Sequence, residues 1–397
     1  MSKLYNTENI LVKELNKFFE NLPCNIYKPQ LKMLPHFLTS IIKAENITTL
    51  DISKVYVDSS FLTNNSSVQK KIWRFLNNSR FNANLLYKSF IKYVISNLKS
   101  IKHNKLTIIM DHMFTKNRFV TLMFSLKVGT QSIPIWFKSD KTKEYRVTDL
   151  DKENSPHLFK EKTIFNAIDE IHELFKDFKA KITFLGDRWF SNLKLMKHIQ
   201  DLGHHFCIRT KVNSSIRFLI YDQKEKHKIY KHFYELPIQK HHSLYYENVP
   251  FGRLNFKCNL STSRGISTDD PWFILSNIEP NKAIREYSHR FGGIETLFKN
   301  QKTNGFNLEK TKIRNLHAFE NLYALICMAC TWLVIIGSDY TKNYQKVKHK
   351  LNIRFVKKIH NKTTRILSLF NLGLTIFRSV YNSFIDYKIK CNMQLYL

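Results

Sequence analysis

The stretch from Tyr287 to Lys302 constrains the chain more than any other, because it sets one acid among bases at helical spacing. It reads Y-S-H-R-F-G-G-I-E-T-L-F-K-N-Q-K, with apolar residues on the remaining side. At about 100° per residue, Tyr287, Arg290, Glu295 and Lys302 fall within an arc of roughly 140°. One carboxylate flanked by cations and a phenol suits a face that holds a metal ion and phosphates. The alternative, on charge pattern alone, is a solvated amphipathic helix.

The net charge narrows the choice of partner. The chain has 397 residues, with 63 Lys and Arg against 32 Asp and Glu, a formal charge of +31. Such an excess indicates a polyanion, and nucleic acid is the commonest one. A basic membrane-surface protein is the rival interpretation. Against it, we recognise no lipidation motif or signal peptide, and the apolar run Leu322–Ile336 is shorter than the roughly 20 residues that a membrane span needs.

The cysteines and histidines show no metal-ligand spacing. Cys327 and Cys330 form a C-x-x-C inside the apolar run, and no second pair or suitable His follows. We therefore expect a buried helix face rather than zinc or redox chemistry, in a reducing cytoplasm. Several histidines lack accompanying acids and are expected at the surface; these are His204, His205, His227, His232, His241 and His242.

Residues 1–104 are predicted to be helical. Leu11–Leu22 and Leu31–Ile42 look amphipathic. Prolines that punctuate these helices are Pro23, Pro29 and Pro35. A polar patch at 63–67 is suited to cap the next helix, which carries Lys70, Lys71, Trp73, Arg74 and Phe75. Basic residues interleaved with aromatics suit a DNA-contacting helix, although a small helical domain with a charged face fits the chemistry equally well.

From Lys105 the pattern changes to strands. Leu106–Met110 is an apolar run that ends at Asp111, and Arg118–Val128 and Gln131–Phe137 follow as a hairpin. An acid at the end of a central strand is well placed to bind a metal. Asp58 competes for this role because it also follows an apolar triplet, but no hairpin comes after it.

A second acid follows the next strand. After a predicted helix at Glu161–Lys176, the strand Lys181–Leu185 ends in G-D-R-W-F, and a helix is predicted from Ser191 to Leu202. Asp187 therefore lies at the carboxyl end of the sheet, where open α/β sheets keep their chemistry. A helix-capping Asp gives the same pattern. Phe206–Arg209 is predicted to be a fifth strand.

The remaining chain returns to this core and then leaves it. Residues 213–268 alternate short strands with polar turns and are predicted to be a β-rich insertion. Pro271–Leu275 is predicted as the strand that leads into the helix at Tyr287–Lys302. Beyond residue 305 the chain is predicted to be helical. Ser338–Arg365 holds nine Lys and Arg and one acid, which fits either a solvated tail or a surface that binds DNA or a partner.

The order of residues resembles a known family. Tyr287, Arg290, Glu295 and Lys302 resemble the Y-R-E-K signature of bacterial insertion-sequence transposases of the DDE type, the large family-four group. There the Glu is the third catalytic carboxylate. The likeness continues through N-G-F-N-L-E at 304–309. Four residues separate Arg290 from Glu295 instead of the common three, and we assign the extra one to Gly292-Gly293, absorbed by a local bulge in the helix.

Other blocks carry the same likeness. I-I-M-D-H-M-F around Asp111, followed by the hairpin and S-I-P-I-W, is similar to the family's first catalytic block. D-R-x-F from Asp187 resembles the second block. W-F-I-L-S from Trp272 resembles the strand before the Y-R-E-K helix, and W-R-F-L-N-N-S-R-F from Trp73 resembles the amino-terminal end-binding region.

The resemblance implies a mixed α/β fold with a ribonuclease-H-like core at 105–212 and 269–305. The β-rich insertion at 213–268 interrupts this core, a helical DNA-binding region at 1–104 precedes it, and a helical region at 306–397 follows it. Asp111, Asp187 and Glu295 would be catalytic and hold two Mg²⁺ ions, with Asp111 bridging both and Mn²⁺ as a substitute. The residues implied in DNA binding are Tyr287, Arg290, Lys299, Lys302, Trp272, Arg188, Lys70, Lys71 and Arg74.

The implied activity is DNA transposition. The enzyme would bind the terminal inverted repeats of its element, cut with water, and join the freed 3′-hydroxyl to target DNA. A homodimer on double-stranded DNA is expected, in the bacterial cytoplasm near the nucleoid and away from membranes. Two alternatives stay open: an inactive DNA-binding relative, and a nuclease of the same fold without strand transfer.

Overall fold

The computed structural model describes residues 12–382, with gaps at 13, 24–25, 57–63, 98–104, 117, 143–158, 179, 223–225, 237, 253–254, 266–269 and 360–361. Asp58, the competing acid, lies outside the described residues, as do Cys24 and Cys391. The helices are α2 (Lys28–Ala44), α3 (Thr49–Val55), α4 (Asn65–Leu76), α5 (Ala83–Ser96), α6 (Glu161–Phe175), α7 (Leu193–Asp201), α8 (Pro280–Lys299), α9 (Leu316–Val347) and α10 (Leu369–Asn382).

Asparagine begins many of these helices. The side chains of Asn64, Asn82, Asn192 and Asn315 accept hydrogen bonds from free backbone N–H groups in the first turns of α4, α5, α7 and α9. Such caps satisfy donors that have no partner inside the helix, and each is worth about 0.5–2 kcal/mol. The polar patch before α4 therefore caps that helix as predicted, through Asn64.

The strands form one large mixed sheet and one small hairpin. They are β1 (Lys105–Thr115), β2 (Phe119–Val128), β3 (Gln131–Lys141), β4 (Lys181–Gly186), β5 (His205–Thr210), β6 (Phe218–Asp222), β7 (His227–Lys231), β8 (Ser243–Phe251), β9 (Phe256–Ser263), β10 (Trp272–Ser276), β11 (Val356–Ile359) and β12 (Lys362–Arg365). The large sheet has the order β3-β2-β1-β4-β5-β10-β9-β8-β6-β7. A mixed α/β fold with flanking helices was expected and is confirmed.

The register of β1 places Asp111 at a fork in the sheet. β1 pairs parallel with β4 as far as Met110 and Gly186, and it pairs antiparallel with β2 through Asp111 to Thr115. The predicted strand end at Asp111 is therefore wrong for β1, but it is right for the contact between β1 and β4. Beyond that last pair the two strands diverge, and Asp111 and Asp187 are the first residues at the opening.

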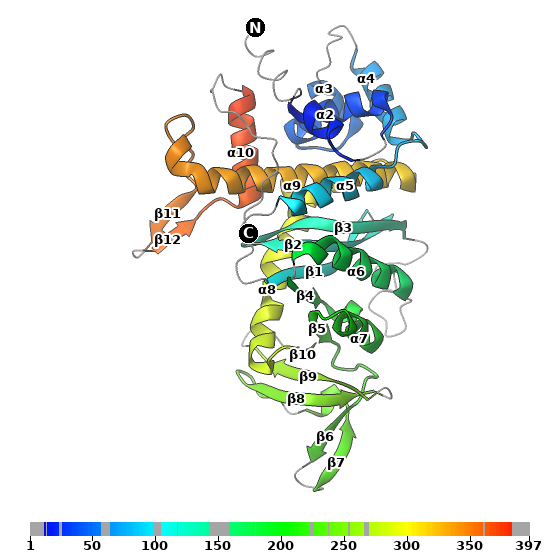
Figure 1. Cartoon of the computed structure of the whole chain (residues 1–397), viewed down its shortest axis with the longest axis vertical. Coiled ribbons are helices and arrows are strands. Elements are labelled where there is room, and N and C mark those ends of the chain that lie inside the picture. Colours follow the sequence, from blue (N-terminus) through cyan, green and yellow to red (C-terminus); the bar gives the residue numbers. More distant parts are fainter. Residues whose placement is uncertain are drawn as a thin grey trace.

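The predicted β-rich insertion is continuous with the core. β9 pairs antiparallel with β10, β8 pairs with β9, and β6 and β7 extend the same sheet beyond them. Figure 1 shows these strands at the lower end of the molecule, away from the amino-terminal helices. An open strand edge leaves backbone donors and acceptors unpaired. β9 supplies hydrogen-bond partners for the backbone groups along the edge of β10.

Helices cover the sheet and join it to the amino-terminal part. In Figure 1, α8 lies on one side of the strands and α6 and α7 lie on the other, while α9 runs between the sheet and helices α2 to α4. α5 lies beside α9 and reaches β3, where the Tyr87 hydroxyl donates to the carbonyl of Pro134. α9 is long and apolar enough to cross a membrane, but 94% of its most apolar 18-residue window is buried in the protein. This agrees with the predicted core helix, in which Cys327 and Cys330 are both buried.

Four local predictions were wrong. Pro35 lies inside α2 rather than at an end of it. The region after residue 305 contains a β-hairpin, β11–β12, besides helices. His204 is buried, and its Nε2 lies 3.0 Å from Nδ1 of His172. The extra residue near Gly292 makes no bulge there, because α8 is regular through Lys299 and a π-helical turn follows at Asn300–Asn304.

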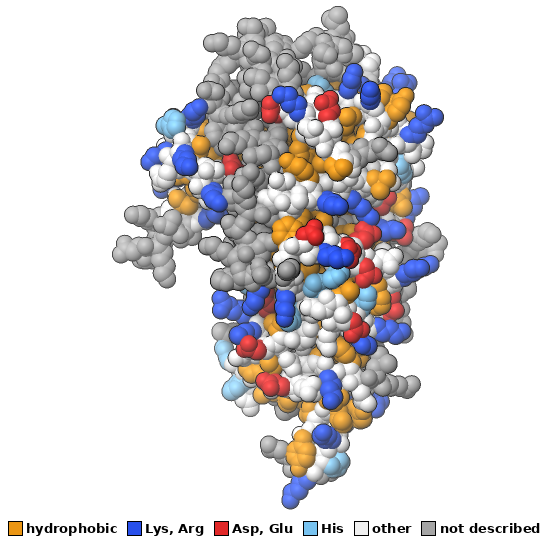
Figure 2. Space-filling model, in the orientation of Figure 1, with side chains coloured by type: hydrophobic (Ala, Val, Ile, Leu, Met, Phe, Trp, Pro, Cys, Tyr) orange, Lys and Arg blue, Asp and Glu red, His pale blue; other side chains and the backbone are white. Residues whose placement is uncertain are grey.

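The surface in Figure 2 carries Lys and Arg over the upper helices, the middle and the lower strands of the visible face. On this face the positive charge is thus spread along the length of the molecule. A long polyanion would find cations over much of this length.

Gly373→Ala should lower the melting temperature. α10 crosses α9 so closely that a Cβ on Gly373 would overlap the carbonyl oxygen of Leu333, and one on Gly337 would overlap that of Leu369. Relieving the overlap requires a shift of backbone, which costs about 1–3 kcal/mol. Thermal unfolding followed by circular dichroism measures this. Gly292→Ala is the control, since its Cβ would lie 3.6 Å from the nearest atom. It should leave stability unchanged or raise it by about 1 kcal/mol. Equal melting of the two variants would contradict the close crossing.

Candidate active site

Three acids far apart in the sequence face one cation. Asp111 comes from β1, Asp187 follows β4, and Glu295 comes from α8. Nη2 of Arg290, also on α8, lies 2.7 Å from Oδ2 of Asp111 and 3.5 Å from Oδ2 of Asp187. Its Nη1 lies 3.9 Å from Oε1 of Glu295. The fold thus brings together all three predicted carboxylates.

The backbone fixes the orientation of both aspartates. Oδ1 of Asp111 accepts a hydrogen bond of 2.8 Å from the N–H of His112, and Oδ1 of Asp187 accepts one of 2.9 Å from the N–H of Trp189. Asp187 therefore caps the short turn Arg188–Phe190 after β4, whereas Asn192 caps the helix α7 that follows. The role of Asp187 as a site acid stays a prediction. Each aspartate keeps its second oxygen for a cation.

Burial makes the charges in this cluster interdependent. The side chains of Arg290, Asp111 and Asp187 are 11%, 13% and 18% exposed, whereas Glu295 is 50% exposed. Burial raises the pKa of Asp111 to about 7 and raises that of Asp187, while the Arg290 guanidinium acts against this on both. A cation between the aspartates is what favours their ionised forms.

The ligand atoms of this cluster are of the type that a hard divalent cation prefers. Three carboxylates supply only oxygen ligands, which Mg²⁺ prefers. Among the described residues, no group of three or more His, Cys, Asp or Glu side chains is arranged to hold a metal ion. Asp111, Asp187 and Glu295 are the residues that would hold such an ion. The Arg290 guanidinium now lies between the Oδ2 atoms of the two aspartates.

His112 packs beside the acids and stays neutral. Its ring stacks on Phe190 with centroids 4.9 Å apart and on Phe159 at 5.9 Å. Burial lowers the pKa of His112 to about 3. Neither ring nitrogen has a hydrogen-bond partner among the described residues. No sequence pattern indicates a role for His112.

Two predicted DNA contacts lie in an aromatic group. Tyr287 is only 1% exposed, and its ring packs edge-on against Trp272 with centroids 5.4 Å apart. Trp272 also stacks on Phe291 at 5.3 Å, and Phe291 is 39% exposed. Tyr287 is therefore packed inside this aromatic group, and Phe291 is its most exposed ring. Their roles in DNA binding stay predictions.

The cations predicted to bind DNA lie in two parts of the molecule, near the acids and on α4. Lys299 is exposed at the end of α8, and Arg188 is exposed directly after Asp187. Lys302 lies in the π-helical turn and pairs with Glu309 at 3.3 Å. On α4, Lys70 and Arg74 are exposed, and the ammonium of Lys71 lies 5.5 Å from the centre of the Tyr56 ring. Figure 1 places α4 on the far side of α9 from the sheet.

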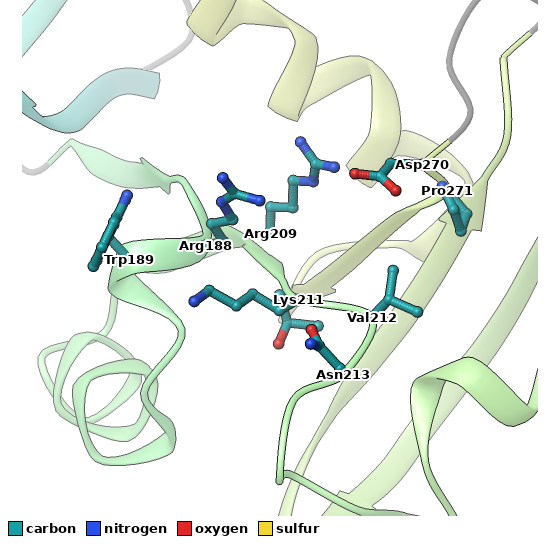
Figure 3. Close-up of a pocket in the computed structure, with 9 residues that line it drawn as sticks. Arg188, Trp189, Arg209, Lys211, Val212, Asn213, Asp270 and Pro271 are labelled. Atoms are coloured by element: carbon teal, nitrogen blue, oxygen red, sulfur yellow. The ribbon is translucent and has the colours of Figure 1, made fainter. Parts of the chain in front are cut away.

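A cavity of about 590 Å³ opens beside Asp187. Figure 3 shows Arg188, Arg209 and Lys211 around it, with Trp189 on one side and Asp270 on the other. Arg209 lies in the buried strand β5 and Lys211 follows that strand. Both were missed because this segment carries no motif. The run H-F-C-I-R-T contains one arginine, Arg209, among mostly apolar residues. The alternation of side chains along a strand could have indicated that Arg209 has a role.

Residues 160–332 match the family model of the transposase DDE domain. The match supports a DDE transposase. No curated protein matches this chain. The matched range covers less than half of the 397 residues. It includes Asp187 and Glu295, runs into α9, and begins after Asp111. Asp111 lies outside the matched range, and only the fold brings it to the other two acids.

Arg290→Ala should lower the melting temperature, because it leaves two buried carboxylates without their counter-ion. Removing one partner of a buried pair costs about 3–5 kcal/mol. Adding Asp111→Asn to this variant should restore part of the loss, since an amide needs no counter-ion. Mg²⁺ should raise the melting temperature of Arg290→Ala more than that of the parent.

Arg285→Ala is the matched control, because Arg285 lies on the same helix and is exposed. It should melt as the parent does. If Arg290→Ala also melts as the parent does, the guanidinium is not the ion that compensates the aspartates.

Proposed function

We propose that this chain is a DNA transposase of the bacterial Y-R-E-K group. It binds the terminal inverted repeats of its insertion sequence, cuts the phosphodiester at the element end and joins the freed end to target DNA. One observation carries the proposal: three acids from β1, the end of β4 and α8 face a single guanidinium. A purely structural salt bridge needs one carboxylate, whereas a metal-dependent phosphoryl transfer site needs several.

The chain order of the sheet supports a ribonuclease-H-like core. β3, β2, β1, β4 and β5 are adjacent in that order, and β2 runs against the other four. The first acid lies on the central strand and the second follows its parallel neighbour. The opening between those two strands is the place where open sheets hold ligands.

The protein side chains prepare this opening for phosphate. Hydrogen bonds from the N–H groups of His112 and Trp189 hold Asp111 and Asp187 with one oxygen each turned to the site. Asp111, Asp187 and Glu295 would hold two Mg²⁺, or Mn²⁺ in its place, which supplies activation of the attacking oxygen and stabilisation of the leaving one. Burial raises the pKa of both aspartates, and before DNA arrives the Arg290 guanidinium acts against this and favours their ionised forms.

The partners follow from the reaction. Terminal repeats and target DNA are double-stranded, and two element ends must be held together for concerted insertion, so we infer a homodimer on DNA. Arg188, Lys299 and Lys302 are proposed to contact DNA near the acids, with Trp272, Tyr287 and Arg290. Lys70, Lys71 and Arg74 of α4 are proposed to contact the terminal repeat. The protein would act in the bacterial cytoplasm, at the nucleoid.

Asp111→Asn, Asp187→Asn and Glu295→Gln should each reduce cleavage about a hundredfold or more while leaving end binding largely intact. Each change removes a charged ligand and keeps the side-chain size. The assay is Mg²⁺-dependent nicking and joining of a duplex that carries the element end, taken from the DNA that flanks the gene.

Glu173→Gln, an exposed acid on α6, is the control and should cleave normally. An Asp111→Asn protein that still nicks would overturn the assignment. A parent that cuts ends but joins none would be a nuclease, and one that binds ends but never cuts would be an inactive relative.

Replacing Lys70, Lys71 and Arg74 together with Ala should weaken binding to the terminal repeat more than binding to random DNA. The reason is that α4 presents these side chains together on one short helix. Titration of both DNAs over a range of salt concentrations measures the difference, since each lost phosphate contact lowers the salt slope by about one.

A triple change of Lys176, Lys197 and Lys282 removes the same charge elsewhere. Each of these lysines pairs with an acid three or four residues away. This control should weaken binding to the terminal repeat and to random DNA by the same factor. If the α4 variant also weakens both by the same factor, α4 does not recognise the sequence of the repeat.

A further inference from the structure

His112 contacts the segments that carry both aspartates. It follows Asp111 on β1, and its backbone N–H donates to Oδ1 of Asp111 at 2.8 Å. Successive side chains of a strand point to opposite faces, so the His112 ring lies on the other face of the sheet from the Asp111 carboxylate. That ring stacks on Phe190, with centroids 4.9 Å apart and planes 9° from parallel. Phe190 is the last residue of the short turn Arg188–Phe190 that follows Asp187.

Phe190 is packed closely against the end of β4. Its side chain is only 1% exposed. A Cβ on Gly186 would lie 2.9 Å from Cβ of Phe190 and 2.9 Å from Cε of Met110. Because glycine has no Cβ, the turn can fold back this closely onto the strand. The position of Phe190 is therefore set by the backbone at Gly186 and by the ring of His112.

The turn connects Phe190 to the Asp187 carboxylate. The N–H of Phe190 donates to the carbonyl of Asp187 at 3.0 Å, and the N–H of Trp189 donates to Oδ1 of Asp187 at 2.9 Å. A shift of Phe190 would therefore displace the carboxylate as well. Oδ2 of Asp111 and Oδ2 of Asp187 lie 2.7 Å and 3.5 Å from the same atom, Nη2 of Arg290. Displacement of the turn would change the separation of these two oxygens.

The His112 ring makes this contact through its flat shape and not through its nitrogens. Nδ1 and Nε2 are both buried and have no hydrogen-bond partner among the described residues. The ring also stacks on Phe159, with centroids 5.9 Å apart and planes 14° from parallel. Stacked aromatic rings attract each other without a hydrogen bond. A phenyl ring can therefore replace the imidazole in this contact, whereas an aliphatic side chain cannot.

We propose that His112 is a positioning residue for the metal site. Its ring holds Phe190, and through Phe190 it keeps the Asp187 carboxylate at the separation from Asp111 that one divalent cation requires. The inference rests on the proposed function and adds to it a residue outside the three acids. Mg²⁺ demands near-ideal octahedral geometry, so its affinity depends on where the carboxylate oxygens lie. Residues that only orient metal ligands commonly change metal affinity by about 10- to 100-fold.

The test measures how tightly each variant of the full chain binds a divalent cation. Mn²⁺ is the probe for electron paramagnetic resonance, and Mg²⁺ is followed through the rise that it causes in the melting temperature. His112→Ala should weaken Mn²⁺ binding about tenfold or more. His112→Leu fills the space without a flat ring and should weaken it to a similar degree. His112→Phe keeps the stack and should bind Mn²⁺ within about twofold of the parent.

The partner ring gives an independent check. Phe190→Ala should weaken Mn²⁺ binding as His112→Ala does. The double variant should bind no more weakly than either single variant, because the two rings act as one unit. In the cleavage assay, about tenfold more Mg²⁺ should restore most of the activity of His112→Ala, since all three carboxylates are still present.

Phe175→Ala is the matched control for the loss of a buried ring. Phe175 lies on α6, is 2% exposed and packs on Phe178. Its truncation should lower the melting temperature, as His112→Ala does, because both leave a cavity in the core. Unlike His112→Ala, it should leave the affinity for Mn²⁺ unchanged. Circular dichroism checks that each variant is folded.

The outcomes are distinct. If His112→Ala and His112→Leu bind Mn²⁺ as tightly as the parent, His112 does not position the acids, and the proposal fails while the proposed function stands. The proposal also fails if His112→Phe loses as much affinity as His112→Ala, because the ring nitrogens would then be required. If the free parent binds no Mn²⁺, the Mg²⁺ concentration at half-maximal cleavage is compared among the same variants, with the same expectations. A parent that neither binds Mn²⁺ nor cleaves element ends overturns the proposed function as well.

Discussion

The contact between Arg290 and the two aspartates is the interaction on which the site depends. Two carboxylates that open from neighbouring parallel strands repel each other, and burial removes the water that would screen them. The chain meets this cost with two backbone N–H groups and one guanidinium. That guanidinium reaches the aspartates only because α8 lies close to β1. Gly293 permits this approach, since a Cβ there would overlap the side chain of Ile109.

The same requirement for close packing connects the site to the amino-terminal helices. α9 is buried along most of its length, and the side chain of Asn321 on it is only 2% exposed. Its amide accepts a hydrogen bond from the N–H of Ala83 and donates to the carbonyl of Leu76, so it fixes the turn between α4 and α5. At its other face, Tyr323 donates to Gln301 in the turn after α8. One buried helix thus sets the position of α4 relative to the acids.

The sequence predicted what local pattern determines. Apolar runs that end at an acid gave Asp111 and Asp187, and helical spacing gave Arg290 and Glu295 on one face. Local sequence patterns did not predict the contacts between distant elements. No pattern indicates that Arg290 reaches both aspartates, that β9 adds the predicted insertion to the core sheet, or that Arg209 and Trp189 share a cavity. Pro35 and His204 were misjudged for the same reason, because tertiary burial overrides local preference.

The charges of the site impose an order on binding. In the proposed reaction, three carboxylates in a partly buried opening would repel the phosphate, and a repulsion between buried charges is little screened by salt. Arg290 offsets part of this negative charge by contacting the Oδ2 atoms of both aspartates. A metal ion held by the same carboxylates would compete with the guanidinium for these oxygens. A phosphate oxygen would then be a suitable partner for Arg290, so the side chain that offsets the acids in the free protein would become available to hold the DNA.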